Sequence, residues 1–209
     1  MASKFLWLLD NGHGGIIDGV YQTKGKRSPG FEDGTVLFEG EFNRSVVKRI
    51  AALCEENGVD FINLVDTEKD IPLSQRTREA NEVHAIEGRC VYVSVHANAF
   101  QPGKDLEFNS ANGIDSFYFE KDGRVSSSGK KLAEIFQKHL KAKTGRRDRG
   151  IKGRNFHVLR KTNMPAVLTE NGFMTNREEA RLLLSNEYRN QVAEAHFGAI
   201  LEIEDRGSI

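Results

Sequence analysis

Hydrophobic and polar residues along this chain form blocks with two different periods. Short apolar or alternating runs predict six strands, over residues 5–10, 59–66, 89–98, 114–120, 156–161 and 166–171. Apolar residues at spacings of three and four predict helices over 39–57, 71–88, 126–140, 177–185 and 186–204. The remaining long segments lack a period and predict loops, at 11–38, 100–113 and the basic stretch 141–154.

This alternation of strands with helices indicates the α/β class. We expect a single domain, with a twisted, mostly parallel or mixed sheet of about six strands flanked by helices on both faces. Asn57-Gly58 predicts the end of the first helix, because glycine is a common C-cap. Ser127 or Ser128 is the expected N-cap of the third helix. The second helix is expected to turn these residues toward the core: Leu73, Ala80, Val83 and Ile86.

Composition narrows the class of protein. The chain has 209 residues, of which 38% are apolar and 29% charged, as expected of a soluble globular domain. Its 30 basic and 30 acidic residues give a net charge of zero, which argues against a nucleic-acid partner. No apolar run reaches the roughly 20 residues of a membrane span. The start, MASKFLWLLDNGHGG, lacks the apolar core of a secretory signal, so we expect synthesis in the cytosol without a visible signal peptide.

The two cysteines and four of the six histidines predict structural roles. Cys54 and Cys90 lie 36 residues apart in apolar patterns, and no C-x-x-C pair indicates a thiolate metal site. Four histidines fall within helix or strand patterns and are expected to be structural: His84, His139, His157 and His196.

The other two histidines stand where predicted strands end. The stretch LLDNGHGG ends an apolar run at His13, which lies among three glycines, and the strand VYVSVHAN ends shortly after His96. Glu170 closes the strand AVLTEN, and Glu39 opens the first long helix. Because ligands bind at the carboxyl ends of strands in α/β sheets, we expect these side chains to converge. Taken singly, each histidine is also explained as a turn residue, and each glutamate as a solvated or helix-terminal charge.

Two imidazoles and two carboxylates are the set that a catalytic zinc site requires. Zinc takes three protein ligands and leaves a fourth position for water. A carboxylate that is not a ligand can then move a proton from that water to a leaving amine. Motifs of other enzyme classes are absent. There is no H-E-x-x-H of helix-borne zinc proteases and no G-x-S-x-G around Ser94. No helix is predicted directly after G-H-G-G, as a dinucleotide site would require.

Segments in a fixed order resemble one enzyme family. DNGHGG, EGEFN, SVHANAF and MPAVLTENGFMTN, with the intervening LSQRTREAN and the block RGIKGRNFHVLRKTNMPAVLTENGF, are similar to the zinc-dependent N-acetylmuramoyl-L-alanine amidases of the type-3 amidase family. The similarity spans residues 5–200. It implies one Zn²⁺ ion, a mixed sheet flanked by helices, and peptidoglycan as substrate. The bond cut would join the lactyl group of N-acetylmuramic acid to L-alanine of the stem peptide.

The resemblance also implies the roles of the site residues. His13, Glu39 and His96 match the zinc ligands, and Glu170 matches the catalytic glutamate that activates water and protonates the leaving amine. Glu41 competes with Glu39, but Glu39 has the matching spacing to the asparagine of EGEFN and lies about 200° around the helix from Glu41.

Two further residues, Asn98 and Arg149, fall in matching segments and are expected to contact substrate. The basic segment 141–154 around Arg149 has two interpretations: it is a surface that attracts anionic stem peptides, or it is a solvated loop. The loop 16–38 is long and charged for its place between the first two ligands.

The sequence shows neither an autoinhibitory helix nor a wall-binding module, so we expect residues 1–209 to form one catalytic domain. This favours a monomeric phage or prophage endolysin, made in the cytosol and acting on the cell wall after release by a lysis system. Two alternatives remain at this point. The first alternative is a catalytically inactive module that binds peptidoglycan. The second is a zinc peptidase that cuts within the stem peptide.

Overall fold

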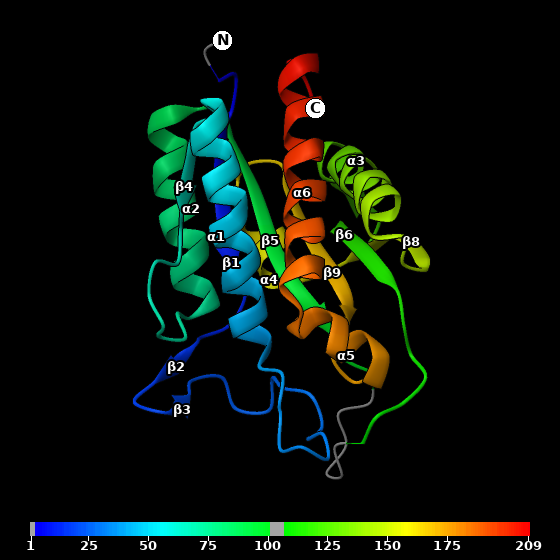
Figure 1. Cartoon of the computed structure of the whole chain (residues 1–209). Coiled ribbons are helices and arrows are strands. Elements are labelled where there is room, and N and C mark those ends of the chain that lie inside the picture. Colours follow the sequence, from blue (N-terminus) through cyan, green and yellow to red (C-terminus); the bar gives the residue numbers. More distant parts are fainter. Residues whose placement is uncertain (1–2, 101–106) are drawn as a thin grey trace.

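The computed structural model describes residues 3–100 and 107–209, which form a sheet with helices on both faces (Figure 1). Seven strands pair in the order β4-β1-β5-β9-β6-β7, and the remaining strand, β8, also pairs with β6. Strands β4, β1, β5 and β9 run parallel, whereas β6 is antiparallel to β9. The strands are β1 (Leu6–Asn11), β4 (Phe61–Asn63), β5 (Cys90–Asn98), β6 (Ile114–Lys121), β7 (Arg124–Val125), β8 (Asp148–Arg154) and β9 (Ala166–Phe173).

The helices are α1 (Glu39–Asn57), α2 (Leu73–Glu87), α3 (Ser127–Thr144), α4 (His157–Lys161), α5 (Arg177–Leu184) and α6 (Asn186–Arg206). Five of the helices in the described part of the chain were predicted in this order, and α4 was not. A small hairpin of β2 (Ile16–Ile17) and β3 (Val20–Tyr21) lies within the long loop that follows β1. The α/β prediction with a mixed, two-sided sheet is therefore confirmed.

The central strands are buried on both faces, which explains their almost continuous apolar sequences. In β1, Trp7 and Leu9 point into a large core with α1, α3 and α6, which Figure 1 shows in front of the sheet. Leu6 and Leu8 point the other way, into a smaller core with α2 and α4. The alternation along the strand thus assigns each side chain to one of the two helical layers.

The ends of two helices show how local sequence sets their length. Helix α1 ends at Gly58, which has a φ of 67° and accepts the left-handed conformation of a C-cap, as predicted. The N-cap of α3 is Ser126, whose hydroxyl accepts a hydrogen bond from the Gly129 amide at 3.1 Å. The prediction of Ser127 or Ser128 was wrong by one or two positions, because serines follow one another there and only packing selects among them.

Two segments have a different structure from the one predicted. The run 156–161 forms helix α4 and not a strand, because a short apolar run does not by its period distinguish the two. The basic segment 141–154 is not a loop throughout: it contains the last turn of α3 and the whole of β8. Among the strands that the structure describes, β8 pairs with β6 alone, and an edge strand tolerates basic side chains because one side faces solvent.

The inner face of α2 also differs from the prediction. Ala80 is buried, but Leu73 is 52% and Ile86 83% exposed. Arg76 and Thr77 are buried in their place. The reason is a buried ion pair beneath the helix, described below, which draws a charged residue inward where periodicity predicts an apolar one. The strand predicted over 59–66 shortens to its central residues, β4.

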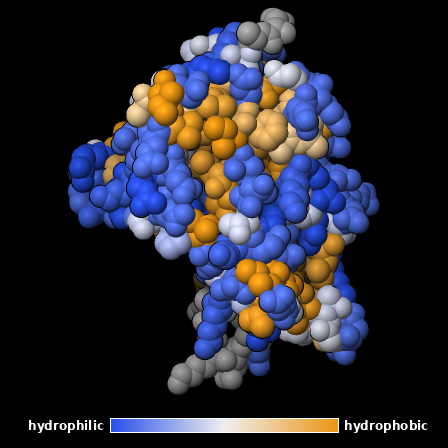
Figure 2. All heavy atoms as spheres, turned by 90° about the vertical axis from the view of Figure 1, so that its left-hand side faces the viewer, coloured by the Kyte–Doolittle hydropathy of each residue, from blue (hydrophilic) through white to orange (hydrophobic). Residues whose placement is uncertain are grey.

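The β4 edge of the sheet faces the viewer in Figure 2, where hydrophobic residues gather between hydrophilic flanks. Phe61 and Ile62 of β4 are partly buried there, against the two cores.

Both cysteines are buried and free. In the described part of the chain, no helix combines the length and apolar character needed to cross a bilayer. Of the loop predicted over 100–113, residues 101–106 lie outside the described residues, and the rest forms neither helix nor strand.

Candidate functional site

The carboxyl ends of three parallel strands bring the predicted site residues to one edge of the sheet. Strand pairing sets His96 of β5 directly opposite Glu170 of β9, and Asp10 of β1 opposite Ser94 of β5. His13 follows the end of β1, and Glu39 is the first residue of α1. Residues far apart in sequence therefore meet because parallel strands end at the same side.

The glycines around His13 have steric reasons that the structure makes plain. His13 itself has a φ of 70°, a left-handed conformation that is uncommon for a residue other than glycine. A side chain on Gly12 would place its Cβ 2.0 Å from Cε1 of His96. A side chain on Gly40 would meet the Gly14 carbonyl oxygen at 1.9 Å. Glycine is needed at both positions so that the loop can pack against the second imidazole and against the start of α1.

His13, Glu39 and His96 form a compact group of possible metal ligands. Their ligand atoms all lie within 4.8 Å of one another. Oε1 of Glu39 is 3.2 Å from Nε2 of His13 and 2.9 Å from Nδ1 of His96. Glu39 is only 2% exposed, whereas the side chain of Glu41 is 40% exposed and faces Arg44. The geometry places Glu39, and not Glu41, between the two imidazoles.

Electrostatics keep this glutamate ionised. Burial alone would raise the pKa of Glu39, but hydrogen bonds and charges from His13 and His96 outweigh burial and lower that pKa. Burial lowers the pKa of His96, and the Glu39 carboxylate opposes this effect. A carboxylate held ionised between two imidazoles is a donor set that suits a divalent cation.

A buried network below His96 fixes the orientation of its ring. The Ser94 hydroxyl donates to Oδ2 of Asp10 at 2.6 Å, so it is left to accept a hydrogen bond from Nε2 of His96 at 3.1 Å. Asp10 is paired with Arg76 at 2.5 Å, and both side chains are 1% exposed. Arg76 also donates to the carbonyl oxygen of Asn11 at 2.8 Å. Sequence reasoning did not assign this network, although Asp10 and Ser94 lie within the quoted motifs.

The network provides a test of whether a metal fits here. If Nε2 of His96 donates to Ser94, then Nδ1 of a neutral ring presents a lone pair to the Glu39 carboxylate. Two acceptors 2.9 Å apart need a cation between them, either a proton on the ring or a metal ion. Two imidazoles and one carboxylate match the ligand choice of catalytic zinc sites. The residues present therefore fit a Zn²⁺ ion.

Glu170 lies apart from these ligands but shares their cavity. A cavity of about 350 Å³ is lined by the three residues named above, by Glu170 and by Lys26 from the loop before α1. Oε2 of Glu170 is shielded from solvent and has no hydrogen-bond partner among the described residues. Burial first, and then the negative charge of Glu39, raise the pKa of Glu170 well above its usual range, and Lys26 opposes this shift. A carboxyl group whose pKa is raised in a cavity is a candidate for acid–base chemistry.

The two expected substrate-contact residues converge on a residue that sequence reasoning missed. Asp115 is 1% exposed and lies opposite Glu170 in the β6–β9 pairing. It accepts hydrogen bonds from Nε of Arg149 at 3.0 Å and from Nδ2 of Asn98 at 3.4 Å, and it also pairs with Lys152. Asn98 lines the cavity, whereas Arg149 is held against Asp115 and the Phe173 ring. The sequence signal that could have identified Asp115 is a charged residue inside the mostly apolar run of a predicted strand.

The remaining histidines lie outside the ligand group. His196 is buried; its Nδ1 donates to the Val192 carbonyl oxygen at 2.7 Å and its Nε2 faces the Thr169 hydroxyl at 2.9 Å. His139 pairs with Glu202 at 2.7 Å. His84 is partly buried on α2. His157 differs from these three histidines because it lines the cavity that contains Glu170.

Comparison with known proteins decides the family. The profile of the N-acetylmuramoyl-L-alanine amidases called Amidase_3 matches residues 8–202. This chain belongs to that family. An endolysin of Bacillus phage SPP1 is 34% identical over 205 residues, which cover 96% of this chain and 66% of the endolysin. The N-acetylmuramoyl-L-alanine amidase LytC of Bacillus subtilis is 29% identical over 92% of this chain, which corresponds to 34% of LytC.

Solved structures of family members share the fold. The N-acetylmuramoyl-L-alanine amidase of Clostridium difficile 630 superposes with a TM-score of 0.78 at 29% identity, over 96% of this chain and 97% of that one. AmiC2 of Nostoc punctiforme, also an N-acetylmuramoyl-L-alanine amidase, gives a TM-score of 0.75 at 31% identity, over 99% and 100% of the two chains. The family resemblance read from the motifs is therefore confirmed.

Proposed function

We propose that this protein hydrolyses the amide bond between N-acetylmuramic acid and L-alanine of peptidoglycan, with one Zn²⁺ ion as cofactor. Family membership supports the reaction, and the convergence of His13, Glu39 and His96 supports the cofactor. The main observation in favour of catalysis concerns Glu170: it is a shielded carboxyl group with a raised pKa, and it lies in the same cavity as those residues.

The chain's own residues divide the proton transfers of amide hydrolysis. Glu170, in its ionised form, accepts a proton from the attacking water, whose oxygen becomes bonded to the lactyl carbonyl carbon. The protonated Glu170 then donates to the alanine nitrogen as the carbon–nitrogen bond breaks, so that carboxylate is restored. Its pKa is raised above the acidic range of an ordinary carboxyl group, which is the direction that favours general acid–base catalysis.

His13, Glu39 and His96 would hold the metal. A bound zinc ion at such a site supplies Lewis-acid polarisation and lowers the pKa of water. The network of Asp10 and Ser94 keeps the His96 ring in one orientation and one tautomer, as hydrogen bonds to metal-ligating histidines do. On this proposal Asn98 contacts substrate directly, while Arg149 acts mainly by holding Asp115.

The endolysin of phage SPP1 supports a role in lysis of the host cell wall, since its similarity covers almost the whole of this chain. We propose that the protein acts on the cell wall and that it works as a monomer. Peptidoglycan is then its partner.

The decisive experiment identifies the new chain ends. Purified peptidoglycan is digested with the protein in the presence of zinc, and amino termini and sugar reducing ends are labelled. New L-alanine amino termini are the expected product. New termini from other stem residues would indicate a peptidase, and retention of the wall without cleavage would indicate an inactive binding module; either result contradicts the proposal.

A further inference from the structure

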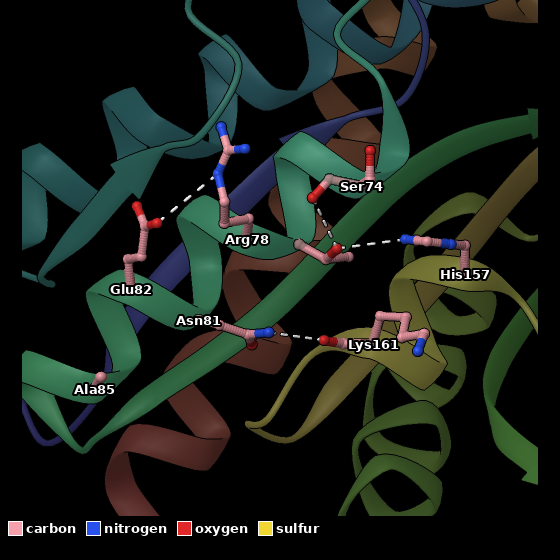
Figure 3. A pocket seen from close by; sticks show the side chains of 8 residues that line it. Ser74, Arg78, Asn81, Glu82, Ala85, His157 and Lys161 are labelled. Atoms are coloured by element: carbon pink, nitrogen blue, oxygen red, sulfur yellow. Dashed lines mark hydrogen bonds and ion pairs between the residues drawn. The ribbon is translucent and has the colours of Figure 1, made fainter.

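A second cavity, of about 500 Å³, lies between α2 and α4 on the face of the sheet opposite α1 and α6 (Figure 3). One wall is a row of α2 side chains that begins at Ser74 and ends at Ala85. The other wall is formed by His157 and Lys161, one helical turn apart on α4. We call this cavity the α2–α4 groove.

Hydrogen bonds between the two walls of the groove fix their spacing. The Asn81 side-chain amide donates to the carbonyl oxygen of Lys161 at 2.8 Å (Figure 3). Its oxygen accepts from the backbone amide of Asn163 at 2.8 Å. The Thr77 hydroxyl lies 3.4 Å from Nε2 of His157. Because the floor is made of satisfied polar groups, the walls keep their spacing without a ligand, which lowers the entropic cost of binding one.

The groove is continuous with the catalytic cavity. His157 lines both of them, and Leu73, which lines the catalytic cavity, immediately precedes Ser74 at the mouth of the groove. At about 350 Å³ the catalytic cavity has the size of a pocket for one drug-sized ligand, which suits the residues on either side of the cleaved bond and not a polymer. A polymeric substrate must therefore extend out of it, and the groove is one path that starts at its rim.

Charge indicates which part of the substrate follows this path. Lys161 is exposed and forms no ion pair with any of the described residues. Arg78 meets only Glu82, at 3.8 Å, and both side chains are about two-thirds exposed, so neither is committed to the other. Burial lowers the pKa of His157, and the positive charges of Arg160 and Lys161, which lie on α4 beside the junction of groove and cavity, lower it further.

We propose that the α2–α4 groove binds the stem peptide beyond L-alanine, and that Lys161 receives the free carboxylate of its second residue. The inference rests on the proposed amidase function. A glycan strand carries hydroxyl and N-acetyl groups, which offer no charge to Lys161 or to the loosely paired Arg78 and Glu82. A stem peptide carries carboxylates for Lys161 and Arg78, and the amino group of its diamino acid suits Glu82.

The test compares substrates that differ in one charge. Two muramyl tripeptides are used, one with a free α-carboxylate on the second stem residue and one with that carboxylate amidated; N-acetylmuramoyl-L-alanine amide lacks the extended stem. We expect Lys161→Gln to lower kcat/KM for the free-acid tripeptide by roughly threefold to tenfold, mainly through KM, as befits a partly solvated ion pair. The loss should shrink at high salt. The other two substrates should be cleaved as by the wild type.

Lys131→Gln is the matched control, because Lys131 is an exposed lysine on α3, against the opposite face of the sheet. It should leave all three rates unchanged. Equal rates for Lys161→Gln and the wild type, or an equal loss on the acid and amidated tripeptides, would overturn the groove assignment while the amidase function stands. If the wild type cleaves none of the three substrates, the amidase function fails, and the groove assignment fails with it.

Discussion

The buried pair of Asp10 and Arg76 leads to a prediction with two separable effects, one on stability and one on zinc binding. Replacing Asp10 with Asn removes the close counter-ion of the buried Arg76 guanidinium and leaves it only the half-exposed carboxylate of Asp70, at 3.6 Å. Such losses cost about 3–5 kcal/mol. Arg76 keeps its hydrogen bond to the Asn11 carbonyl oxygen, and the new amide can still accept from it, so we expect a loss near the lower end, about 3 kcal/mol. Because small domains are stable by about 5–15 kcal/mol, the variant should still fold.

The second effect concerns the His96 ring. Asp10 orients the Ser94 hydroxyl, which accepts from Nε2 of His96. Without the carboxylate this orientation weakens, and zinc affinity should fall by roughly 10- to 100-fold, the usual range for lost partners of metal-ligating histidines. Urea unfolding of the zinc-free protein measures the first effect, and zinc titration against a competing chelator measures the second.

Two variants separate the effects. Ser94→Ala keeps the ion pair but removes the link to His96, so it should lose zinc affinity with a stability cost of only about 1 kcal/mol. The double change Asp10→Asn with Arg76→Met removes both charges, so it should regain much of the stability without regaining affinity. Wild-type zinc affinity in both Asp10→Asn and Ser94→Ala would refute the role assigned to the network.

Three further predictions concern single residues. Glu170→Gln should keep its zinc, measured by elemental analysis, but lose roughly 100-fold or more in turnover, measured by release of L-alanine amino termini; full turnover would exclude it as the acid–base group. Glu39→Gln should lose most of its zinc and Glu41→Gln none, so equal zinc contents would contradict the ligand assignment. Burial lowers the pKa of His196 from 6.5 to about 4, so the unfolded state binds more protons between these values. The free energy of unfolding should therefore fall by about 3 kcal/mol as pH drops from 6.5 to 4. Urea titrations should show a flatter pH profile for His196→Gln, and an unchanged profile would refute this cause.

What the sequence determined by itself is what depends on neighbours along the chain. Continuous apolar runs identified the buried strands β1 and β5, and a glycine after Asn57 identified the end of α1, because burial and backbone conformation act residue by residue there. The family motifs identified four polar side chains at strand and helix ends, and the sheet brings them to one edge.

What only the tertiary structure decided is which residues meet across the sheet. Asp10 and Ser94 are separated by 84 residues, and the buried Arg76 guanidinium finds its close ion-pair partner in Asp10, 66 positions away. Asp115 likewise belongs to the site only because strand pairing sets it opposite Glu170. Periodicity reports how much of a segment is buried but not what it is buried against. A buried charge needs a specific partner to offset its desolvation, and that partner is supplied by the fold.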